Sequence, residues 1–269
     1  MEFVEKVILK LLGGDEIEKK LLRCQNYQSN SLLLWKKQTN LNWFETVKFL
    51  KAIEIFDANR IRETINILVS NNIEIFSKPN LFITSFGSEG KSGGKIAYEF
   101  RHTKLIDEKN FVNAWELSKL PESSTIIFVE DLIGTGSQST EYILEKLNLI
   151  INPSSEPYLL TICATPEGIN KVSSETNFKV INGVLLEEAN YQHYTENSKY
   201  FSVKEKRKLI ELNSRLKNPK RKDFDRGLLI TFHYSPPNNS MPILWKDNFP
   251  FVDKKGFDNK WKALLPREY

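Results

Sequence analysis

The sequence predicts an α/β protein in which an open, mainly parallel sheet follows an α-helical layer. Apolar residues recur at helical spacing through residues 1–76, with few turn-forming residues between them. From residue 77 onward the pattern changes to short apolar runs that end in glycine or polar residues, and helical stretches separate many of these runs. Such alternation favours a parallel sheet covered by helices on both faces.

The helical layer is expected to end near residue 76, which divides the chain into a helical N-terminal region (1–76) and a second domain (77–269). Ile61, Ile65 and Leu68 show the spacing of its last helix. Asp57 offers that helix an N-cap side chain for the free amides of the first turn. The last part of the second domain is expected to form a hood over the sheet.

Six runs of strand length follow, and several are apolar on both faces, as is typical of parallel strands buried between helices. The predicted strands are Leu81 to Phe86, Lys95 to Phe100, Thr125 to Val129, Tyr158 to Cys163, Lys179 to Leu185 and Leu228 to His233. The predicted helices between them are Phe111 to Leu120, Ser139 to Leu147 and Val203 to Leu216. Ligands of such sheets bind beyond the carboxyl ends of the strands.

Composition excludes several classes of protein. With 269 residues, of which 40% are hydrophobic, the chain can bury a large core, so disorder is not expected. No apolar run approaches the roughly 20 residues that span a bilayer, and the N-terminus does not resemble a signal peptide, so we expect a cytoplasmic protein without membrane contact. Cys24 and Cys163 fit buried thiols. A net charge of +4, from 38 basic and 34 acidic residues, does not predict nucleic-acid binding, and the basic stretch 204–222 fits a solvated helix face.

The most informative segment runs from Ile126 to Ser139. A buried strand delivers two adjacent carboxylates, Glu130 and Asp131, to its end, and a glycine-flanked turn then leads into a helix. Backbone amides of such a turn, together with the helix dipole, make a site for a phosphate dianion. The predicted phosphate-binding residues are Gly134, Thr135, Gly136, Ser137, Gln138 and Ser139. The two acids would accept hydrogen bonds from ribose hydroxyls and stabilise positive charge on the sugar ring. The structural alternative is an acidic strand end followed by a capped helix.

This segment resembles the ribose-phosphate motif of the type I phosphoribosyltransferases. The resemblance implies binding of phosphoribosyl pyrophosphate with Mg²⁺, followed by attack of a nitrogen base at the anomeric carbon. It assigns catalytic roles to Glu130 and Asp131 and makes Asp131 the metal ligand. Gln138 departs from the family pattern, since many members have a hydroxyl residue there, so its phosphate contact would pass to Ser139.

A second segment, Leu81 to Gly94, ends a predicted strand in a glycine-rich loop with one lysine, which suits a polyphosphate. In the phosphoribosyltransferase interpretation this is the pyrophosphate loop, where Lys91 neutralises the leaving group and counts as catalytic. The predicted pyrophosphate ligands are Gly87, Ser88, Gly90, Lys91 and Ser92, with Arg101 reaching in from the end of the next strand. For Arg101 a solvent-exposed strand exit is an equal alternative.

Gly90-Lys91-Ser92 also resembles the end of a P-loop, which would make the chain a nucleotide hydrolase. That pattern requires a glycine where Ser85 stands and a helix directly after the serine. Here Ser92 leads into Gly93, Gly94 and an expected strand. The interpretation also leaves the turn at residues 134–139 without a role.

A third segment, Thr231 to Trp245, contains prolines that fix an irregular loop, and its amides and aromatic rings suit a planar heterocycle. We predict that Asn238, Asn239 and Trp245 bind the base. The alternative is a structural loop pinned by its asparagines.

Together the three segments resemble divergent phosphoribosyltransferase-like domains of bacterial conflict and phage-defence systems. Two hypotheses follow. The chain is an enzyme that acts on a 5-phosphoribosyl compound, or it is a sensor or assembly module that binds a nucleotide or phosphosugar without turnover and signals to a protein partner in a defence complex.

Overall fold

The computed structural model describes residues 2–29, 31–88, 90–191, 197–216, 227–252 and 258–267. The chain forms two compact units. Unit 1 combines Met1–Asp57 with Glu188–Tyr269, and unit 2 is the intervening Ala58–Glu187. This division differs from the expected boundary after residue 76, because the first helices share a hydrophobic core with the C-terminal part of the chain.

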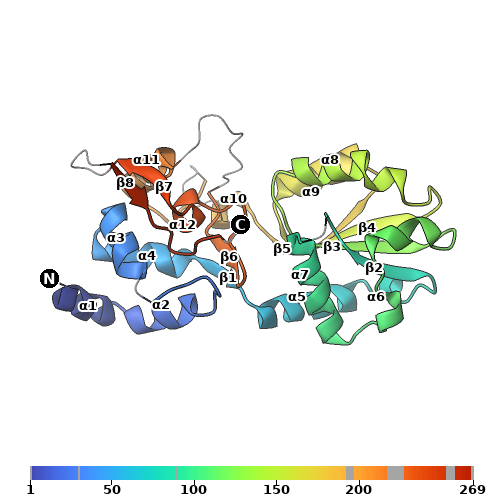
Figure 1. Ribbon diagram of the computed structural model, residues 1–269, viewed down its shortest axis with the longest axis horizontal. Helices are drawn as coiled ribbons and strands as arrows, with labels where there is room; N and C mark the ends of the chain where they lie inside the picture. The colour runs from blue at the N-terminus through green and yellow to red at the C-terminus, as the bar shows by residue number, and fades with distance from the viewer. Residues whose placement is uncertain are drawn as a thin grey trace. The chain divides into compact units, whose positions relative to one another are not determined.

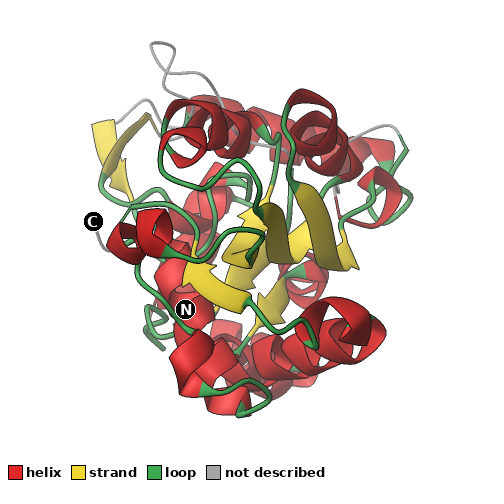
Figure 2. Ribbon diagram, turned by 90° about the vertical axis from the view of Figure 1, so that its right-hand side faces the viewer, coloured by secondary structure: helices red, strands yellow, loops and turns green. Residues whose placement is uncertain are grey.

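Unit 2 contains a four-stranded sheet in the order β2 (Leu81–Ser85), β3 (Thr125–Ile133), β4 (Glu156–Ala164) and β5 (Lys179–Leu185). All three pairings in this sheet are parallel. Figure 2 shows its strands between layers of helices. The predicted fold class, an open parallel sheet with flanking helices, is therefore confirmed.

Helices cover both faces of the sheet, as Figure 1 shows. One face carries α5 (Ala58–Asn71) and α7 (Ser92–Thr103), and the other carries α8 (Ser137–Glu145) and α9 (Pro166–Glu175). Buried side chains of β3, among them Ile126 and Phe128, belong to a core that includes residues of α8 and α9. Apolar burial between these layers holds the strand ends in fixed positions. The shorter elements are α6 (Ile73–Phe76) and the 3-10 turns η1 (Glu108–Asn110), η2 (Ala114–Lys119) and η3 (Leu147–Leu149).

Two predicted elements of unit 2 differ from the structure, one of them entirely and the other in part. Lys95 to Phe100 lies inside the 12-residue helix α7 rather than in a strand. Ile96 and Phe100, four residues apart, are both buried, and Glu99 between them accepts an ion pair of 2.7 Å from Arg62 on α5. The predicted helix from Phe111 to Leu120 is helical only in part: Ala114–Lys119 forms a 3-10 helix, whereas Phe111 forms a bridge to Ile83 of β2.

Unit 1 is mainly helical, as the N-terminal pattern predicts, but it also contains short strands. Its elements are α1 (Glu2–Leu11), α2 (Gly14–Leu21), α3 (Ser31–Thr39), α4 (Trp43–Ala52), β1 (Glu54–Phe56), α10 (Glu188–Tyr191), α11 (Val203–Arg215), β6 (Ile230–Phe232), α12 (Pro242–Trp245), β7 (Phe249–Val252) and β8 (Asp258–Trp261). The run from Leu228 to His233 was expected in the main sheet. Its strand β6 instead pairs in parallel with β1, a strand that the sequence did not indicate.

The core of unit 1 joins the two ends of the chain. Trp35 is fully buried and donates its indole N–H to the carbonyl oxygen of Ile243 over 2.8 Å. Its ring lies 5.3 Å from that of Phe49, centroid to centroid. Trp261 and Leu264 belong to the same buried cluster. Because apolar contacts of this kind supply most of a domain's stability, the N-terminal helices depend on the C-terminal segment.

Two expectations from composition can be compared with the structure. Cys24 and Cys163 are both free and buried, as predicted. Burial raises the pKa of the Cys24 thiol to about 12, which keeps it protonated and unreactive. Within the described ranges, we find no helix of the length and apolarity that crossing a bilayer requires.

One ion-pair cluster at the start of β4 makes the stability of the protein depend on pH. Hydrogen bonds from Lys179, Lys78 and Tyr158 lower the pKa of Glu156 to about 2. A carboxyl group with a lowered pKa stabilises the fold above its unfolded pKa, and this contribution is lost as pH falls toward about 2. Since the cluster is partly exposed, we expect Glu156→Gln to destabilise the protein by at most about 1 kcal/mol at pH 7. The difference in unfolding free energy between the two proteins, measured by urea titration, should be much smaller at pH 2 than at pH 7, and an equal difference at both pH values would contradict this account.

Candidate functional site

The sheet brings two of the three predicted segments to one edge. Strands β2 and β3 are neighbours, and Ser85 stands opposite Val129 in their register. The glycine-rich loop that begins at Gly87 and the acidic segment that begins at Glu130 therefore leave the sheet side by side, at the carboxyl ends of parallel strands. This is where ligands bind to sheets of this kind.

The two acids lie within β3, which extends to Ile133. Asp131 is 8% exposed. Glu130 is half-buried, and its Oε1 accepts hydrogen bonds from the Ser92 hydroxyl at 2.6 Å and from the Asp131 amide at 2.9 Å. Burial raises the pKa of Glu130, and the neighbouring Asp131 carboxylate raises it further. The two hydrogen bonds lower the pKa only in part, so the pKa of Glu130 lies well above its usual value. The site thus holds a repulsive pair of carboxyl groups.

The turn after β3 presents amides that have no protein acceptor. Gly136 has a φ of +75°, a conformation that favours glycine, and α8 begins at Ser137. Among the described residues, the backbone N–H groups of Thr135, Gly136, Gln138 and Ser139 donate no hydrogen bond, and that of Ser137 reaches only the Thr135 hydroxyl at 3.4 Å. Ser137 and Gln138 are exposed, whereas Ser139 is buried. These donors are not capped internally.

Helix α9 holds this turn in place. The Thr165 hydroxyl donates to the Gly134 carbonyl oxygen over 2.5 Å, and the Thr165 amide donates to Ile133 over 3.0 Å. Thr165 is the N-cap of α9, and Gly168 lies against the Gly134 carbonyl so closely that a Cβ atom would not fit. Sequence analysis missed both residues. The Thr165-Pro166 pair is a helix-start signal, but no local pattern indicates which turn that start contacts.

The glycine-rich loop adopts the conformations that its glycines allow, with φ of +87° at Gly87 and +81° at Gly90. Lys91 is exposed and forms the N-cap position of α7, which begins at Ser92. The helix that a P-loop requires after the serine is therefore present, so the expectation of a strand there was wrong. The glycine that a P-loop needs at position 85 remains a serine.

The structure does not bring Arg101 to this loop. Arg101 lies in the last turn of α7, nine residues after Ser92, which corresponds to about 13 Å along the helix axis. Its guanidinium group lies 5.1 Å from the centre of the Phe111 ring. The proposed pyrophosphate contact rested on a strand over Lys95 to Phe100, and the helix places this residue at the opposite end.

The third segment belongs to unit 1, where several of its polar groups form hydrogen bonds within the unit. Trp245 donates its indole N–H to the Ser240 carbonyl oxygen over 3.0 Å, and the guanidinium group of Arg267 lies 4.9 Å from the Trp245 ring centre. Arg267 also donates to the side-chain oxygen of Asn238, and the Asn239 carbonyl oxygen accepts from Leu228 over 3.4 Å. These contacts favour the structural alternative, while base binding by Asn238, Asn239 and Trp245 stays a prediction.

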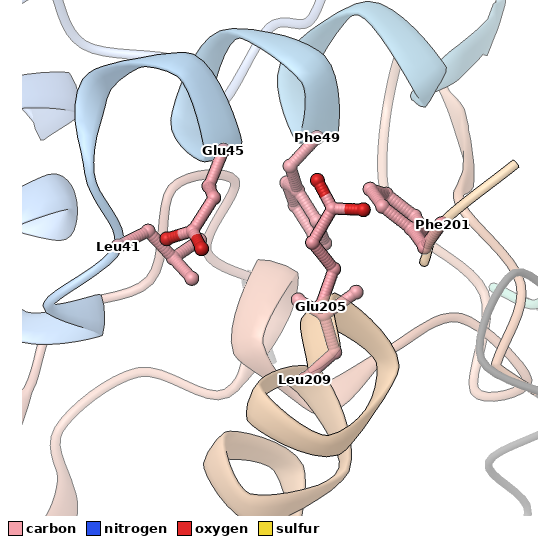
Figure 3. A pocket seen from close by; sticks show the side chains of 6 residues that line it. All are labelled: Leu41, Glu45, Phe49, Phe201, Glu205 and Leu209. Atoms are coloured by element: carbon pink, nitrogen blue, oxygen red, sulfur yellow. The ribbon is translucent and has the colours of Figure 1, made fainter. Parts of the chain in front are cut away.

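A small cavity of about 10 Å³ lies in unit 1 between α4 and α11, and it contains none of the predicted site residues. Figure 3 shows Glu45 and Glu205 beside Phe49 and Phe201 at its lining. Each carboxylate already has a cationic partner, because Lys208 pairs with Glu45 and Lys48 pairs with Glu205 at 2.9 Å. The space suits about one water molecule, so we interpret it as a packing void.

The carboxylates of β3 fit a divalent cation. Glu130 and Asp131 supply oxygen ligands of the kind that Mg²⁺ prefers, and a bound cation would offset the repulsion between the two carboxyl groups. In the described part of the chain, no cluster of three or more His, Cys, Asp or Glu side chains could hold a metal by itself. A cation here would therefore share its coordination with oxygens of a phosphorylated ligand and water.

Several solved structures of phosphoribosyltransferases are distantly similar to part of the chain. Among solved structures, orotate phosphoribosyltransferase from Aeropyrum pernix is 10% identical, with 48% of this chain and 73% of that chain covered and a TM-score of 0.35. Adenine phosphoribosyltransferase from Trypanosoma brucei, in complex with AMP, pyrophosphate and ribose-5-phosphate, is 12% identical, with 56% and 77% covered and a TM-score of 0.36. A hypoxanthine-guanine-xanthine phosphoribosyltransferase is 15% identical, with 54% and 86% covered and a TM-score of 0.33.

None of the curated proteins matches the chain. The family model described as PRTase-CE matches residues 32–267, which span the sheet, the acidic segment and most of unit 1. The chain therefore belongs to the PRTase-CE family and has a phosphoribosyltransferase-like fold.

Proposed function

We propose that the chain binds a 5-phosphoribosyl compound at the edge formed by β2 and β3 and acts at its anomeric carbon. The observation that carries this proposal is the set of backbone amides of Thr135, Gly136, Gln138 and Ser139, which have no protein acceptor and follow shortly after two adjacent carboxyl groups in β3. Donors in this arrangement suit a phosphate dianion, and the carboxyl groups suit the hydroxyls of the attached sugar. Family membership supports this reading of the site.

In the proposed complex each segment has one task. The turn at Gly134 to Gly136 and the start of α8 hold the 5-phosphate. Asp131 holds Mg²⁺ and, with Glu130, binds the ribose hydroxyls. The exposed ammonium group of Lys91 neutralises pyrophosphate on the neighbouring loop. No general base is required, because a dissociative reaction at the anomeric carbon depends mainly on positioning and on stabilisation of charge.

The test is incubation of the protein with phosphoribosyl pyrophosphate, Mg²⁺ and a panel of nitrogen bases, with release of pyrophosphate as the readout. We expect release by the unmodified protein and a loss of at least about 100-fold in Asp131→Asn, because the amide carries no charge to hold the cation or stabilise the sugar. Asp107→Asn is the matched control, since this aspartate side chain is 76% exposed. Equal rates for the Asp131 variant and the control would contradict the assigned role.

The same residues would serve a sensor or assembly module that binds a nucleotide or phosphosugar without turnover. In that case phosphoribosyl pyrophosphate should raise the melting temperature of the protein while no pyrophosphate appears. The two functions therefore separate in one experiment that records both signals.

Two observations favour a nucleotide hydrolase as a second candidate. Helix α7 begins at Ser92, as a P-loop requires, and the Ser92 hydroxyl donates to Glu130. Serine at position 85 and the turn at residues 134–139 do not fit that candidate. Hydrolysis of ATP, or a larger thermal shift with ATP than with ribose 5-phosphate, would favour it over the phosphosugar proposal.

We further propose that the protein acts in a bacterial antiphage or conflict system, together with a protein partner. This proposal rests on the resemblance of the three segments to domains from such systems. Expression in a bacterial host should lower the plating efficiency of susceptible phages, and Asp131→Asn should restore it. Equal plating with both proteins would contradict a role of this site in defence.

A further inference from the structure

The phosphate turn needs a positive charge that its own segment does not supply. Residues 125–145, which form β3, the turn and α8, contain four carboxylates and neither lysine nor arginine. The helix dipole and the free amides favour an anion, but this field is opposed by Glu130 and Asp131 just upstream. A phosphate dianion at the turn would therefore gain from a cationic side chain contributed by another element.

Helix α9 brings such a side chain to the turn. A Cβ atom built on Gly136 would lie 2.8 Å from the Gly168 carbonyl oxygen and 3.1 Å from the Cβ atom of Lys171. The Lys171 side chain therefore starts beside the glycine that completes the turn, close enough that a methyl group on Gly136 would press against it. Lys171 follows Gly168 by three residues, so both lie on the helix face that contacts the turn.

The direction of this side chain also favours contact with the turn. Cα–Cβ bonds of a helix tilt toward its N-terminus, and the N-terminus of α9 is the end fixed to Gly134 through Thr165. The Lys171 ammonium group now lies 3.1 Å from the Glu175 carboxylate, one helical turn farther along, in a pair whose side chains are 35% and 48% exposed. Exposed pairs of this spacing are weak, so a bound dianion can compete for the ammonium group.

We propose that Lys171 is a phosphate-binding residue of this site, and that Glu175 competes with the ligand for it. The proposal rests on the proposed function, because it assigns a further residue to the same 5-phosphate subsite. A side chain at Gly136 would separate Lys171 from the turn and would strain a backbone of positive φ.

The test is calorimetric titration of the full chain with ribose 5-phosphate and, separately, with pyrophosphate and Mg²⁺. We expect Lys171→Gln to weaken binding of ribose 5-phosphate about tenfold and Lys171→Arg to retain most of it. Glu175→Gln should act in the opposite direction and tighten binding about two- to threefold, because it frees the ammonium group. Both effects should shrink as salt is raised, and pyrophosphate binding should change in none of the variants.

The outcomes separate the two proposals. Absence of ribose 5-phosphate binding by the unmodified protein would overturn the proposed function, and with it the role of Lys171. Binding by the unmodified protein that Lys171→Gln leaves unchanged would overturn the role of Lys171 alone. Lys171→Gln could instead weaken binding of ribose 5-phosphate and of pyrophosphate equally, or lower the melting temperature of the protein. Either result would show that the residue acts on the fold or on the overall electrostatic potential, and would also overturn this inference.

Discussion

Gly93→Ala is expected to destabilise the protein by about 3 kcal/mol or more, one of the largest effects of any single methyl group in unit 2. A Cβ atom at this position would overlap the carbonyl oxygen of Phe86. It would also lie 2.7 Å from the carbonyl oxygen of Val129 and 2.8 Å from the amide nitrogen of Phe86. All three are backbone atoms, of Val129 in β3 and of Phe86 directly after β2, and they cannot shift as a flexible side chain could. Helix α7 would have to move away from β2 and β3, and thus carry Ser92 away from Glu130.

Gly94→Ala provides a matched control within the same turn of α7. An added Cβ atom at Gly94 meets nothing within 4 Å. Alanine also favours a helix over glycine, so this variant should be neutral or more stable by up to about 1 kcal/mol. Urea unfolding of the two variants measures the contrast. Equal stability of the two proteins would contradict the close packing of α7 on the sheet.

Glu130→Gln is expected to stabilise the unliganded protein at alkaline pH and to abolish its function. The pKa of Glu130 is raised, so the fold favours the neutral carboxyl group. The neutral carboxyl group of Glu130 contributes its full stabilisation below the unfolded pKa of about 4.3, and this contribution is lost as pH rises through the raised pKa of the folded state. Glutamine is neutral throughout and can still accept from Ser92. We expect the melting temperature of the variant to exceed that of the unmodified protein by about 2–6 °C at pH 8.

The pH dependence of this difference is the decisive measurement. The melting temperatures of the two proteins should converge near pH 4, where both side chains are neutral. Glu141→Gln, at an exposed position of α8, is the control and should show no such divergence. A Glu130→Gln protein that is less stable than the unmodified one at pH 8 would show that the charged carboxylate contributes to the fold.

The elements of the sheet that lie under two helical layers could be predicted from the sequence. The edge strand β5 was predicted with its observed bounds from Lys179 to Leu185, although Ile181 is its only buried residue. The runs from Thr125 to Val129 and from Tyr158 to Cys163 are buried throughout and identify β3 and β4. Long apolar runs of this kind carry a strong local signal because both faces are buried. The motif from Glu130 to Ser139 was found for a similar reason, since acids, glycine turn and helix start follow one another directly along the chain.

Other features depend on contacts between distant residues and left no local pattern. In the run from Lys95 to Phe100, the apolar residues Ile96, Tyr98 and Phe100 alternate as they would in a strand. In the structure the buried residues are instead Ile96, Glu99 and Phe100, which have helical spacing, and this pattern becomes visible only once α7 packs against α5 and the sheet. Strand β1 has only 3 residues and is defined by its pairing with β6, far along the chain. The support of the phosphate turn by Thr165 and Gly168 is likewise a contact between separate strand–helix units.

The discontinuous composition of unit 1 has a consequence for the nascent chain. The indole of Trp35 donates to Ile243, which follows it by 208 residues in the sequence. Trp261 and Leu264 belong to the same core. Residues 58–187 contain every strand of their own sheet, so the ribosome releases a segment that can collapse early. The first helices gain these core contacts only after residues 243–264 have been synthesised, so we expect them to be the part of unit 1 that a chaperone binds during synthesis.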